Sequence, residues 1–349
     1  MSRASNLAGF TTSISPPSSL SVGIVTATSV QTTSINNGPL AGMRNAIING
    51  NFDIWQRGTS FTGGYGSDRW ATNVNGSTAV TSRQAFILGQ TDVPGEPTYF
   101  SRTVVTSVAN AANYVQLVQL IEDVRTFANQ QITVSFWAKA DASRPISVQM
   151  GQRFGSGGSP SDNAYFGITK TTIGTSWQKI AITATVPSIS GETLGTDNNS
   201  SLGFDIWFDA GSDFNSRTDT LGQQSGTFDI AQVQVEPGPV ATPFERRPIG
   251  TELSLCQRYF QILPAMQGAM DATNSTLSVT PMFQVPIRAA PTYVLRSGTN
   301  GAHHPGAVFR NITAITGDIN TVNATLNVAF GANIPGQIFA GAVTASAEL

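Results

Sequence analysis

The residues best suited to bind a ligand are two tryptophans on predicted β-strands. In the segment 131–140, apolar residues occupy every second position, which places Trp137 on the opposite, polar face of the strand. The segment 201–209 alternates in the same way and places Asp205 and Trp207 on its polar face. An aromatic ring flanked by polar groups suits a sugar, because the C–H face of the sugar stacks on the ring while polar groups bind its hydroxyls.

A third predicted strand, 145–154, adds an amide and a guanidinium to this pattern. Its aliphatic residues alternate so that Gln149 and Arg153 point away from the core. The three strands together predict one polar sheet face that binds a glycan through Trp137, Gln149, Arg153, Asp205 and Trp207. The alternative is that both faces of the sheet are buried, one in the core and one beneath loops or a neighbouring subunit, as is common for tryptophan.

The sequence contains no motif that predicts catalysis, so we expect a protein that is not an enzyme. Glu122 and Asp123 follow an apolar strand and fit a turn better than the acid and base of a glycosidase, whose separation a sequence does not fix. The single cysteine, Cys256, lies on the apolar side of a predicted helix. A small buried side chain is the usual role of such a cysteine.

The composition argues against two classes of partner. Charged residues make up 11% of the chain, against about 25% in average soluble proteins, and the net charge is −2. The few lysines are scattered and form no basic stripe, so we expect no nucleic-acid partner. No apolar run approaches the roughly 20 residues that cross a bilayer, so we expect no insertion into a membrane.

Strand-length segments separated by turn residues fill residues 43–247, which predicts an all-β fold and, within it, a β-sandwich. The expected strands are 46–55, 70–73, 79–87, 99–108, 114–121, 131–140, 145–154, 164–169, 177–187, 202–209 and 227–235. In the last of these strands, Ala231, Val233 and Val235 are expected on one face.

Two further regions flank the predicted sandwich. Residues 248–349 are expected to form a smaller β domain with one short helix near 251–259 and strands near 277–285, 293–296, 307–315, 324–330 and 340–344. Residues 1–42 contain one charge, Arg3, and a single β-prone stretch. We interpret them as an extended N-terminal arm that pairs with another chain, and the alternative is a flexible leader.

Three stretches of the chain resemble tail-fibre and related virion surface proteins of bacteriophages. They are the segment from Ala241-Thr-Pro-Phe-Glu-Arg-Arg-Pro to Phe260, the segment Arg44-Asn-Ala-Ile-Ile-Asn-Gly-Asn-Phe-Asp to Gly58 with Ser67-Asp-Arg-Trp70, and Val285-Pro-Ile-Arg-Ala-Ala-Pro-Thr292. The resemblance implies a tail fibre, spike or head fibre located in the virion. Such a protein would attach to other virion proteins through residues 1–42, form a homotrimer and recognise a host cell-surface polysaccharide.

The predicted sandwich is similar in its strand pattern to the jelly-roll fold of carbohydrate-binding modules. Asn49-Gly-Asn-Phe-Asp53 and Phe228-Asp229 match the first and last strands of these modules. Many of the modules hold a structural calcium ion between those strands, so the resemblance implies Ca²⁺ at Asp53 and Asp229. Without the metal, each carboxylate would cap a turn or pair with a nearby arginine.

Two other functions stay open for a chain of this kind. A polysaccharide depolymerase tailspike would need a carboxylate pair in a cleft and usually has a long β-helix built from sequence repeats. The sequence shows no such repeats. A head decoration or neck component would be purely structural and bind no glycan. The three functions differ in whether the purified protein binds a capsular polysaccharide intact, shortens it or ignores it.

Overall fold

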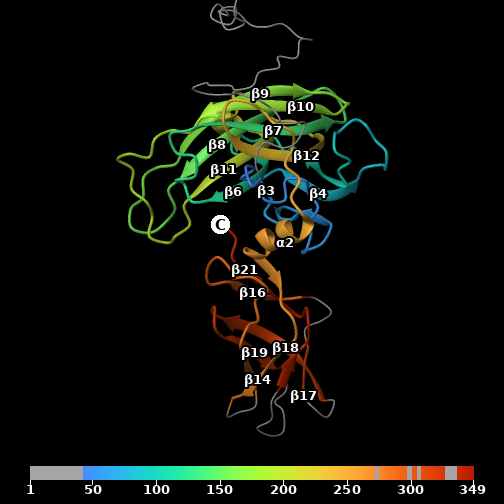
Figure 1. The fold of residues 1–349 in the computed structure, drawn as a ribbon, viewed down its shortest axis with the longest axis vertical. Coiled ribbons are helices and arrows are strands. Elements are labelled where there is room, and N and C mark those ends of the chain that lie inside the picture. The colour runs from blue at the N-terminus through green and yellow to red at the C-terminus, as the bar shows by residue number, and fades with distance from the viewer. Residues whose placement is uncertain (1–41, 272–274, 297–300, 305–307, 327–335) are drawn as a thin grey trace, which may run out of the picture. The chain divides into compact units, whose positions relative to one another are not determined.

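The computed structural model describes residues 42–349 apart from 272–274, 297–300, 305–307 and 327–335 (Figure 1). The chain divides into two compact units, Met1–Thr32 and Thr33–Leu349, and all described residues belong to the second unit. The predicted N-terminal arm therefore lies, except for Gly42, outside the described residues.

Two six-stranded antiparallel sheets form a β-sandwich (Figure 1). The first sheet has the order β1 (Ser60–Thr62), β4 (Thr78–Ala85), β5 (Tyr99–Thr106), β12 (Gly226–Pro237), β7 (Gln131–Ala140) and β10 (Gln178–Thr185). The second has the order β2 (Gly64–Tyr65), β3 (Ala71–Asn75), β6 (Tyr114–Glu122), β11 (Ser201–Ala210), β8 (Arg144–Arg153) and β9 (Ala164–Ile173). The all-β class and the sandwich predicted from the sequence are confirmed.

Aromatic side chains from both sheets fill the space between them. Phe136 of the first sheet and Phe204 of the second are fully buried, with ring centroids 6.2 Å apart. Phe208 and Phe228 stack across the sandwich at 4.7 Å. Full burial of one such side chain contributes about 1.5–3 kcal/mol to folding, so these pairs account for much of the attraction between the sheets.

The predicted strand 46–55 is not a strand. Asn49 and Phe52 have positive φ angles of 57° and 55°, which turn the backbone out of the extended region. The Asn49 amide then closes the turn, since Nδ2 donates to the Ile54 carbonyl at 2.9 Å and Oδ1 accepts from the Ile54 N–H at 2.9 Å. The segment packs its apolar side chains into the core without joining either sheet.

A β-bulge interrupts the pairing of β12 with β7. Ala231 lies opposite Trp137 and Gln234 opposite Ser135, so two residues of β12 face one residue of β7. The extra residue reverses the alternation, and Val233 and Val235 join Phe228 and Ile230 in the core. The predicted placement of Ala231 on one face with Val233 and Val235 is therefore wrong.

The C-terminal region has a hydrophobic core of its own. It begins with helix α2 (Ile249–Gln257), close to the predicted 251–259. A three-stranded sheet contains β13 (Phe260–Ile262), β21 (Val343–Ser346) and β16 (Thr292–Leu295), and a closed barrel contains β14 (Met266–Met270), β15 (Thr276–Val279), β19 (Val322–Leu326), β18 (Val308–Gly317), β17 (Gly301–His304) and β20 (Gly336–Ile338). The predicted second β region with one short helix is confirmed, while the boundaries 43–247 and 248–349 stay predictions.

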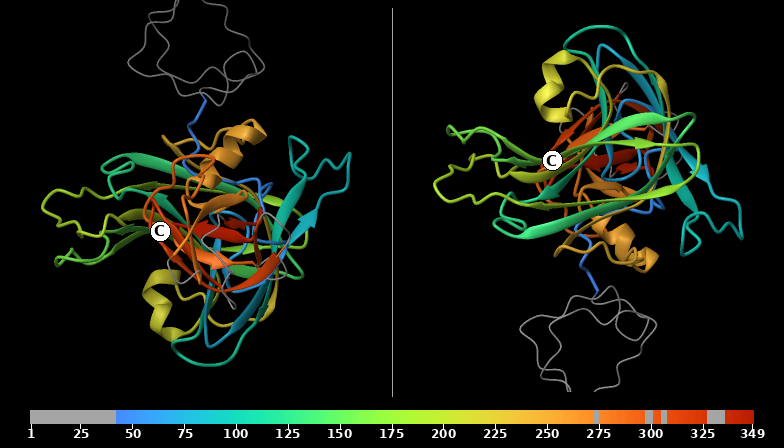
Figure 2. Two further views of the ribbon diagram at one scale, coloured as in Figure 1. Left: turned by 90° about the horizontal axis from the view of Figure 1, so that it is seen from below. Right: turned by 90° about the horizontal axis from the view of Figure 1, so that it is seen from above.

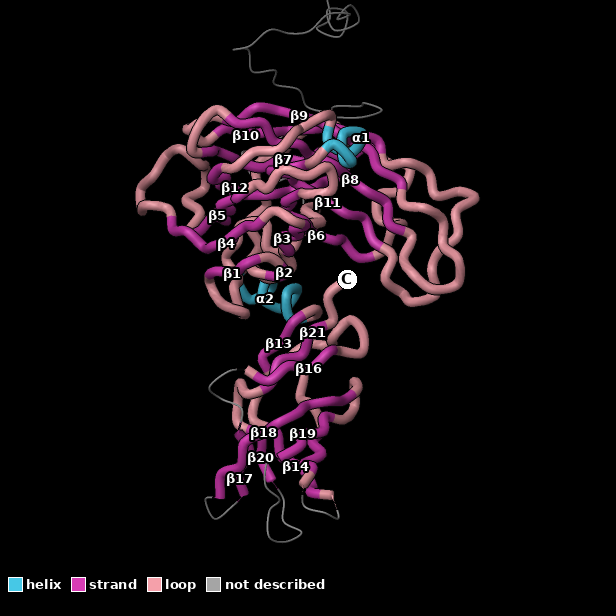
Figure 3. The backbone as a smooth tube through the Cα atoms, turned by 180° about the vertical axis from the view of Figure 1, so that it is seen from behind, coloured by secondary structure: helices cyan, strands magenta, loops and turns pink. Residues whose placement is uncertain are grey.

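Helices are few and loops are long (Figure 3). Besides α2, the described residues contain the short helices η1 (Ser212–Phe214) and α1 (Asn215–Thr218). No helix among them is long and apolar enough to cross a membrane. Two long loops run side by side, with the Asp197 N–H donating to the Ser156 carbonyl at 3.1 Å, and they extend from the sandwich in Figure 2.

Candidate functional site

The five residues predicted to bind a glycan do not share one face. Trp137 belongs to β7 in the first sheet, whereas Gln149 and Arg153 on β8 and Asp205 and Trp207 on β11 belong to the second. All five leave the core as predicted, but they do so on opposite outer sides of the sandwich. The prediction of a single polar face is wrong because alternation shows whether a side chain leaves the core and not which sheet it leaves.

Three of the four predicted residues of the second sheet form a polar network with Arg217. Asp205 is fully buried, and it accepts hydrogen bonds from Gln149 Nε2 at 3.0 Å and from the Arg153 guanidinium at 2.9 Å. Arg217 Nε donates in turn to Gln149 Oε1 at 3.1 Å. Burial raises the pKa of the Asp205 carboxyl above its ordinary value, although Arg153 and Arg217 oppose the shift. These polar groups bind one another, while Arg153 Nε, Ser147 Oγ and Trp207 Nε1 are buried without a partner among the described residues.

Trp207 lies beneath this outer face and has no exposed surface. Its ring packs against Tyr114 at 5.5 Å and against Phe214 at 5.3 Å, and the Arg217 guanidinium lies 5.0 Å from its centre. Phe214 and Arg217 come from η1 and α1, which cover this part of β11. For Trp207, the alternative drawn from the sequence, a tryptophan buried under loops, describes the structure.

Trp137, by contrast, is partly exposed and lines a hollow of about 510 Å³ on the outer side of the first sheet. The hollow is mostly apolar and is lined by Asn51, Pro94, Gly95, Trp137, Lys179, Gln232, Ala241, Pro243, Phe244 and Arg246. The cross-strand neighbours of Trp137 are Ala231 on β12 and Lys179 on β10. The small side chain of Ala231 leaves one edge of the indole uncovered by its own sheet.

The bulge in β12 shapes one wall of this hollow. Gln232 has a φ of 49°, an uncommon conformation for a residue other than glycine. Its Nε2 donates to the Pro94 carbonyl at 2.7 Å and so holds the 94–95 loop beside Trp137. Bulges and unusual backbone angles are frequent next to binding sites, because they aim a side chain that regular pairing would not.

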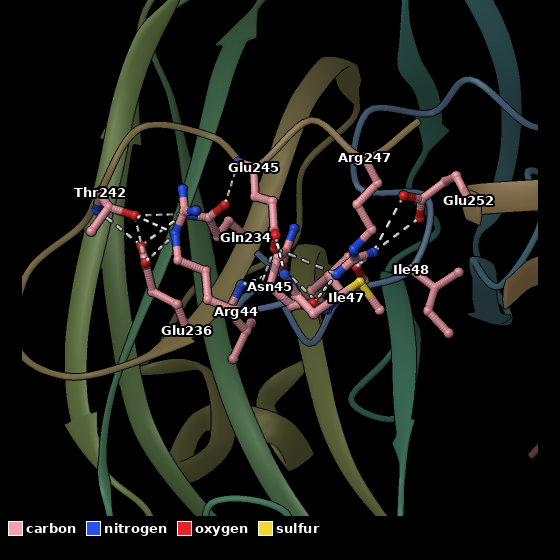
Figure 4. Close-up of polar contacts among 12 residues, drawn as sticks. Arg44, Asn45, Ile47, Ile48, Gln234, Glu236, Thr242, Glu245, Arg247 and Glu252 are labelled. Atoms are coloured by element: carbon pink, nitrogen blue, oxygen red, sulfur yellow. Dashed lines mark hydrogen bonds and ion pairs between the residues drawn. The ribbon is translucent and has the colours of Figure 1, made fainter. Parts of the chain in front are cut away.

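The connector after β12 forms the opposite wall and is fixed by buried polar side chains (Figure 4). Gln234 Oε1 accepts from the Glu245 N–H at 2.7 Å, and Glu236 accepts from the Thr242 N–H at 2.9 Å. Arg44 Nε lies 3.2 Å from Glu236 in a nearly buried ion pair. This network holds Pro243 and Phe244 in place at the hollow.

Two of the stretches that resemble phage fibres pack against each other here. The Asn45 N–H donates to Glu245 Oε2 at 2.8 Å, and Arg247 donates to the carbonyls of Asn45 and of Ile47 (Figure 4). Both stretches also line the hollow, one through Asn51 and the other through residues 241–246. The sequence segments with the most specific pattern therefore build the walls around Trp137.

Asn51 lines the hollow and has a buried acceptor without a partner in the described chain. Its side chain is only 7% exposed, Nδ2 donates to Asp53 Oδ2 at 2.8 Å, and Oδ1 has no partner among the described residues. Because a carboxylate only accepts, this bond fixes which end of the amide is the oxygen. Buried polar atoms are nearly always hydrogen-bonded, so this buried Oδ1 without a partner is an exception among the described residues.

Asn51 reaches this position because Gly50 lies against the bulge. A Cβ at Gly50 would lie 2.1 Å from the Val233 carbonyl oxygen, and the Val233 N–H donates to the Gly50 carbonyl at 2.8 Å. Only glycine allows such a close approach of two backbones. The sequence prediction missed Asn51 and Gln232, although the break in the alternation of β12 was a signal for the latter.

The calcium ion implied at Asp53 and Asp229 does not fit the surroundings of Asp229. Both of its carboxylate oxygens accept from Arg102, each at 2.8 Å, and Lys139 Nζ lies 3.9 Å away. Two cations thus occupy the side of the carboxylate that a metal would need. Among the described residues, no group of three or more His, Cys, Asp or Glu is placed to hold a metal ion. Calcium stays a prediction that this pairing does not favour.

Two other residues singled out in the sequence have structural partners. Burial alone would raise the pKa of Glu122, but hydrogen bonds from Arg258 at 2.8 Å and Tyr259 at 2.8 Å lower it below its ordinary value. A general acid needs the opposite shift. Cys256 is fully buried, as predicted, and burial raises the pKa of its thiol.

Comparisons with known sequences give no relatives. No protein-family model matches the chain, and no curated protein matches it. The phage-fibre resemblance of the three stretches is therefore not confirmed by any sequence comparison.

Comparisons with solved structures give distant similarities to part of the chain. A structure titled "CBM4 structure and function" is 18% identical and covers 54% of this chain and 98% of its own, with a TM-score of 0.30. A family 11 carbohydrate-binding module from Clostridium thermocellum, in complex with a β-1,3-1,4-mixed-linked tetrasaccharide, is 12% identical over 53% of this chain and 97% of its own, with a TM-score of 0.32. The enzymatically active domain of tailspike protein 4 of bacteriophage CBA120 is 14% identical over 56% of this chain but only 22% of its own, with a TM-score of 0.32. Scores this low establish neither kinship nor function.

Proposed function

We propose that this protein binds a glycan without cleaving it, and that the sugar occupies the hollow at Trp137. The observation that carries the proposal is the partly exposed indole in a mostly apolar hollow of about 510 Å³. Ligand sites usually measure about 300–1,000 Å³ and combine apolar walls with a few fixed polar groups. The hollow has both properties.

Each part of the hollow has a role in this proposal. The indole of Trp137 stacks on the C–H face of a sugar ring, and Phe244 adds apolar surface. Asn51 and Gln232 contribute polar side chains to the lining. Since the neighbouring bonds to Asp53 and from Gln232 to Pro94 already fix the walls, binding orders little of the protein.

The proposal moves the predicted site. Trp137 keeps its role as the stacking platform, whereas Gln149, Arg153, Asp205 and Trp207 stabilise the other side of the sandwich. Asn51 and Gln232 take the place of these four residues as polar groups at the sugar. The site remains in the sandwich and outside the C-terminal region.

The experiment is a binding titration of Trp137→Ala with oligosaccharides from bacterial cell surfaces. Loss of aromatic stacking should weaken binding by about 1–3 kcal/mol, or roughly 5- to 150-fold. Trp177→Ala is the control, because Trp177 directly precedes β10, is also partly exposed and packs on Phe86, Phe100 and Lys139 without lining the hollow. Equal loss in both variants, or none in either, contradicts the proposed site.

The same titration tests the absence of catalysis. The size distribution of the polysaccharide should be unchanged after long incubation with the protein. Shortened chains would make the protein a depolymerase, and no binding at all would leave a purely structural component.

The resemblance of the three stretches supports a location for this activity. We infer a virion surface protein, a tail fibre, spike or head fibre, that forms a homotrimer, joins other virion proteins through residues 1–42 and binds a host polysaccharide. Light scattering of the full-length protein should give a trimer, and a monomer at micromolar concentration would contradict it. Removal of residues 1–42 should leave a folded sandwich that no longer joins particles.

A further inference from the structure

The charged side chains that line the Trp137 hollow all have the same sign. They are Lys179 and Arg246, and no carboxylate is among the described residues that line it. The whole chain has 21 acidic residues against 19 basic ones, so this local excess of positive charge does not follow from the composition.

Lys179 is placed beside the indole. It lies directly opposite Trp137 in the register of β10 and β7, and its Nζ donates to the Thr242 carbonyl at 3.2 Å. It forms no ion pair among the described residues, and burial lowers the pKa of its ammonium although the Glu236 carboxylate opposes the shift. The ammonium can donate three hydrogen bonds, so it retains donors for a ligand.

Arg246 stands at the connector side of the hollow. Its guanidinium donates to the Gly95 carbonyl at 3.3 Å and forms no ion pair with a described carboxylate. Its neighbour Arg247 differs, because it lies 3.2 Å from Glu252 and is almost completely buried. Arg246 also lines a second hollow of about 610 Å³ together with Asp53, whose carboxylate it attracts without forming an ion pair.

Two cations without ion-pair partners at one sugar-sized hollow call for an anion. We propose that the hollow selects an anionic glycan, whose carboxylate or phosphate group binds Lys179 and Arg246 while a sugar ring stacks on Trp137. This inference rests on the proposed glycan function and specifies its ligand class. Hydrogen bonds between charged partners are roughly twice as strong as neutral ones, and the planar guanidinium matches either anion through two parallel bonds.

The ligand class is tested on an array of bacterial surface oligosaccharides that includes neutral, uronic-acid-bearing and phosphate-bearing members. The full-length protein should bind anionic members, and chemical reduction of the carboxyl groups or removal of the phosphate should weaken binding about tenfold or more. The two treatments separate a carboxylate ligand from a phosphate ligand. Binding to anionic members should also fall with added salt.

A second experiment removes the positive charge of Lys179 or of Arg246. Lys179→Gln and Arg246→Gln should each weaken binding to the best anionic glycan about tenfold, with no change for its carboxyl-reduced or dephosphorylated form. Lys170→Gln is the matched control, because Lys170 makes a similar single bond, to the Thr220 carbonyl at 3.1 Å, on the other sheet. It should have no effect.

The outcomes separate the two proposals. If the best ligands are neutral and their binding depends on Trp137, the glycan function stands and the anionic ligand class is overturned. If anionic glycans bind but Lys179→Gln and Arg246→Gln behave like Lys170→Gln, the assignment of the two cations is overturned. If nothing on the array binds, or Trp137→Ala changes nothing, the proposed function itself fails and this inference fails with it.

Discussion

The outer side of β7 and the outer side of β11 begin from the same sequence pattern and end in opposite surroundings. Each strand places aliphatic residues in the core and a tryptophan outside it, Trp137 in one sheet and Trp207 in the other. Trp207 is fully buried, whereas Trp137 is partly exposed at a hollow. The difference lies in what covers each sheet and not in the strands themselves.

The two coverings come from different distances along the chain. Trp207 is covered by Phe214 and Arg217, which follow it by only a few residues. Trp137 faces a connector that is anchored on β12 through Gln234 and Glu236 and that leaves the indole uncovered. The segment that covers Trp207 packs aromatic rings directly on it and leaves no space. The connector beside Trp137 is held by its bonds to β12 and leaves a hollow next to the indole.

The largest expected effect is a loss of stability when the buried Trp207 is removed. Trp207→Ala should lower the free energy of unfolding by about 3–5 kcal/mol, because it removes a buried ring from between Tyr114 and Phe214. Chemical denaturation followed by circular dichroism measures the change. Trp137→Ala is the matched variant and should cost clearly less, since its ring is already partly in water.

Two results would contradict the difference between Trp137 and Trp207. Equal losses of stability would show that Trp137 is a packing residue as well, and the hollow would then be a gap in the packing. A glycan affinity that falls with Trp207→Ala and not with Trp137→Ala would return the binding site to the second sheet.

An intermediate loss of stability is expected when the ion pair between Asp229 and Arg102 is removed. Asp229→Asn should lower the free energy of unfolding by about 1–3 kcal/mol, because the Arg102 guanidinium loses the opposite charge and one of its two hydrogen bonds. A calcium chelator should not change the melting temperature of either protein. Chelation that lowers the melting temperature of the unaltered protein, but not of Asp229→Asn, would establish the calcium site at this residue instead.

The smallest effect is expected at the end of β6. Hydrogen bonds from Arg258 and Tyr259 outweigh the effect of burial and lower the pKa of Glu122 below its ordinary value of 4.5. The folded state therefore favours the charged form, and this stabilisation is present above the ordinary pKa and is lost as the pH falls through the lowered one. Its size should be at most about 1 kcal/mol, because the side chains of Arg258 and Glu122 are 43% and 34% exposed.

Melting temperatures of the unaltered protein and of Glu122→Gln, recorded from neutral pH down to about pH 3, give the measurement. The difference between the two proteins should shrink as the pH falls. A constant difference would mean that Glu122 contributes through packing and not through its charge.

Much of the sandwich could be predicted because its strands are long and alternate regularly. The segment predicted as 131–140 is β7, and the segments predicted as 145–154 and 202–209 differ from β8 and β11 by one residue at each end. The error at 46–55 arose because Asn49 and Phe52 adopt positive φ angles in a turn that the Asn49 side chain closes on Ile54 and on the Asp68 carbonyl. Alternation within the segment could not show those bonds.

Less of the site could be predicted, because the alternation of a strand does not show which segments outside the sheet pack on it. Nothing in the strand around Trp207 shows that Phe214 would fold back onto it. The bulge could have been predicted from the sequence, because the apolar residues Phe228, Ile230, Val233 and Val235 break a period of two after Ile230. The buried acceptor of Asn51 could not, because it depends on the contact between Gly50 and β12.

The long sequence separation of the contacts around the hollow has a consequence for synthesis of the chain. The bonds from Asn45 to Glu245 and from Asn49 to Glu252 join residues 200 and 203 positions apart. At about 5–20 residues per second, a ribosome adds that length of chain in roughly 10–40 s. Within this time Trp137 is made well before Gln232 and the connector residues of 241–246 that line the hollow with it. A growing chain therefore carries an incompletely covered sheet surface until the connector has emerged, and packing of the connector is the step that completes the hollow.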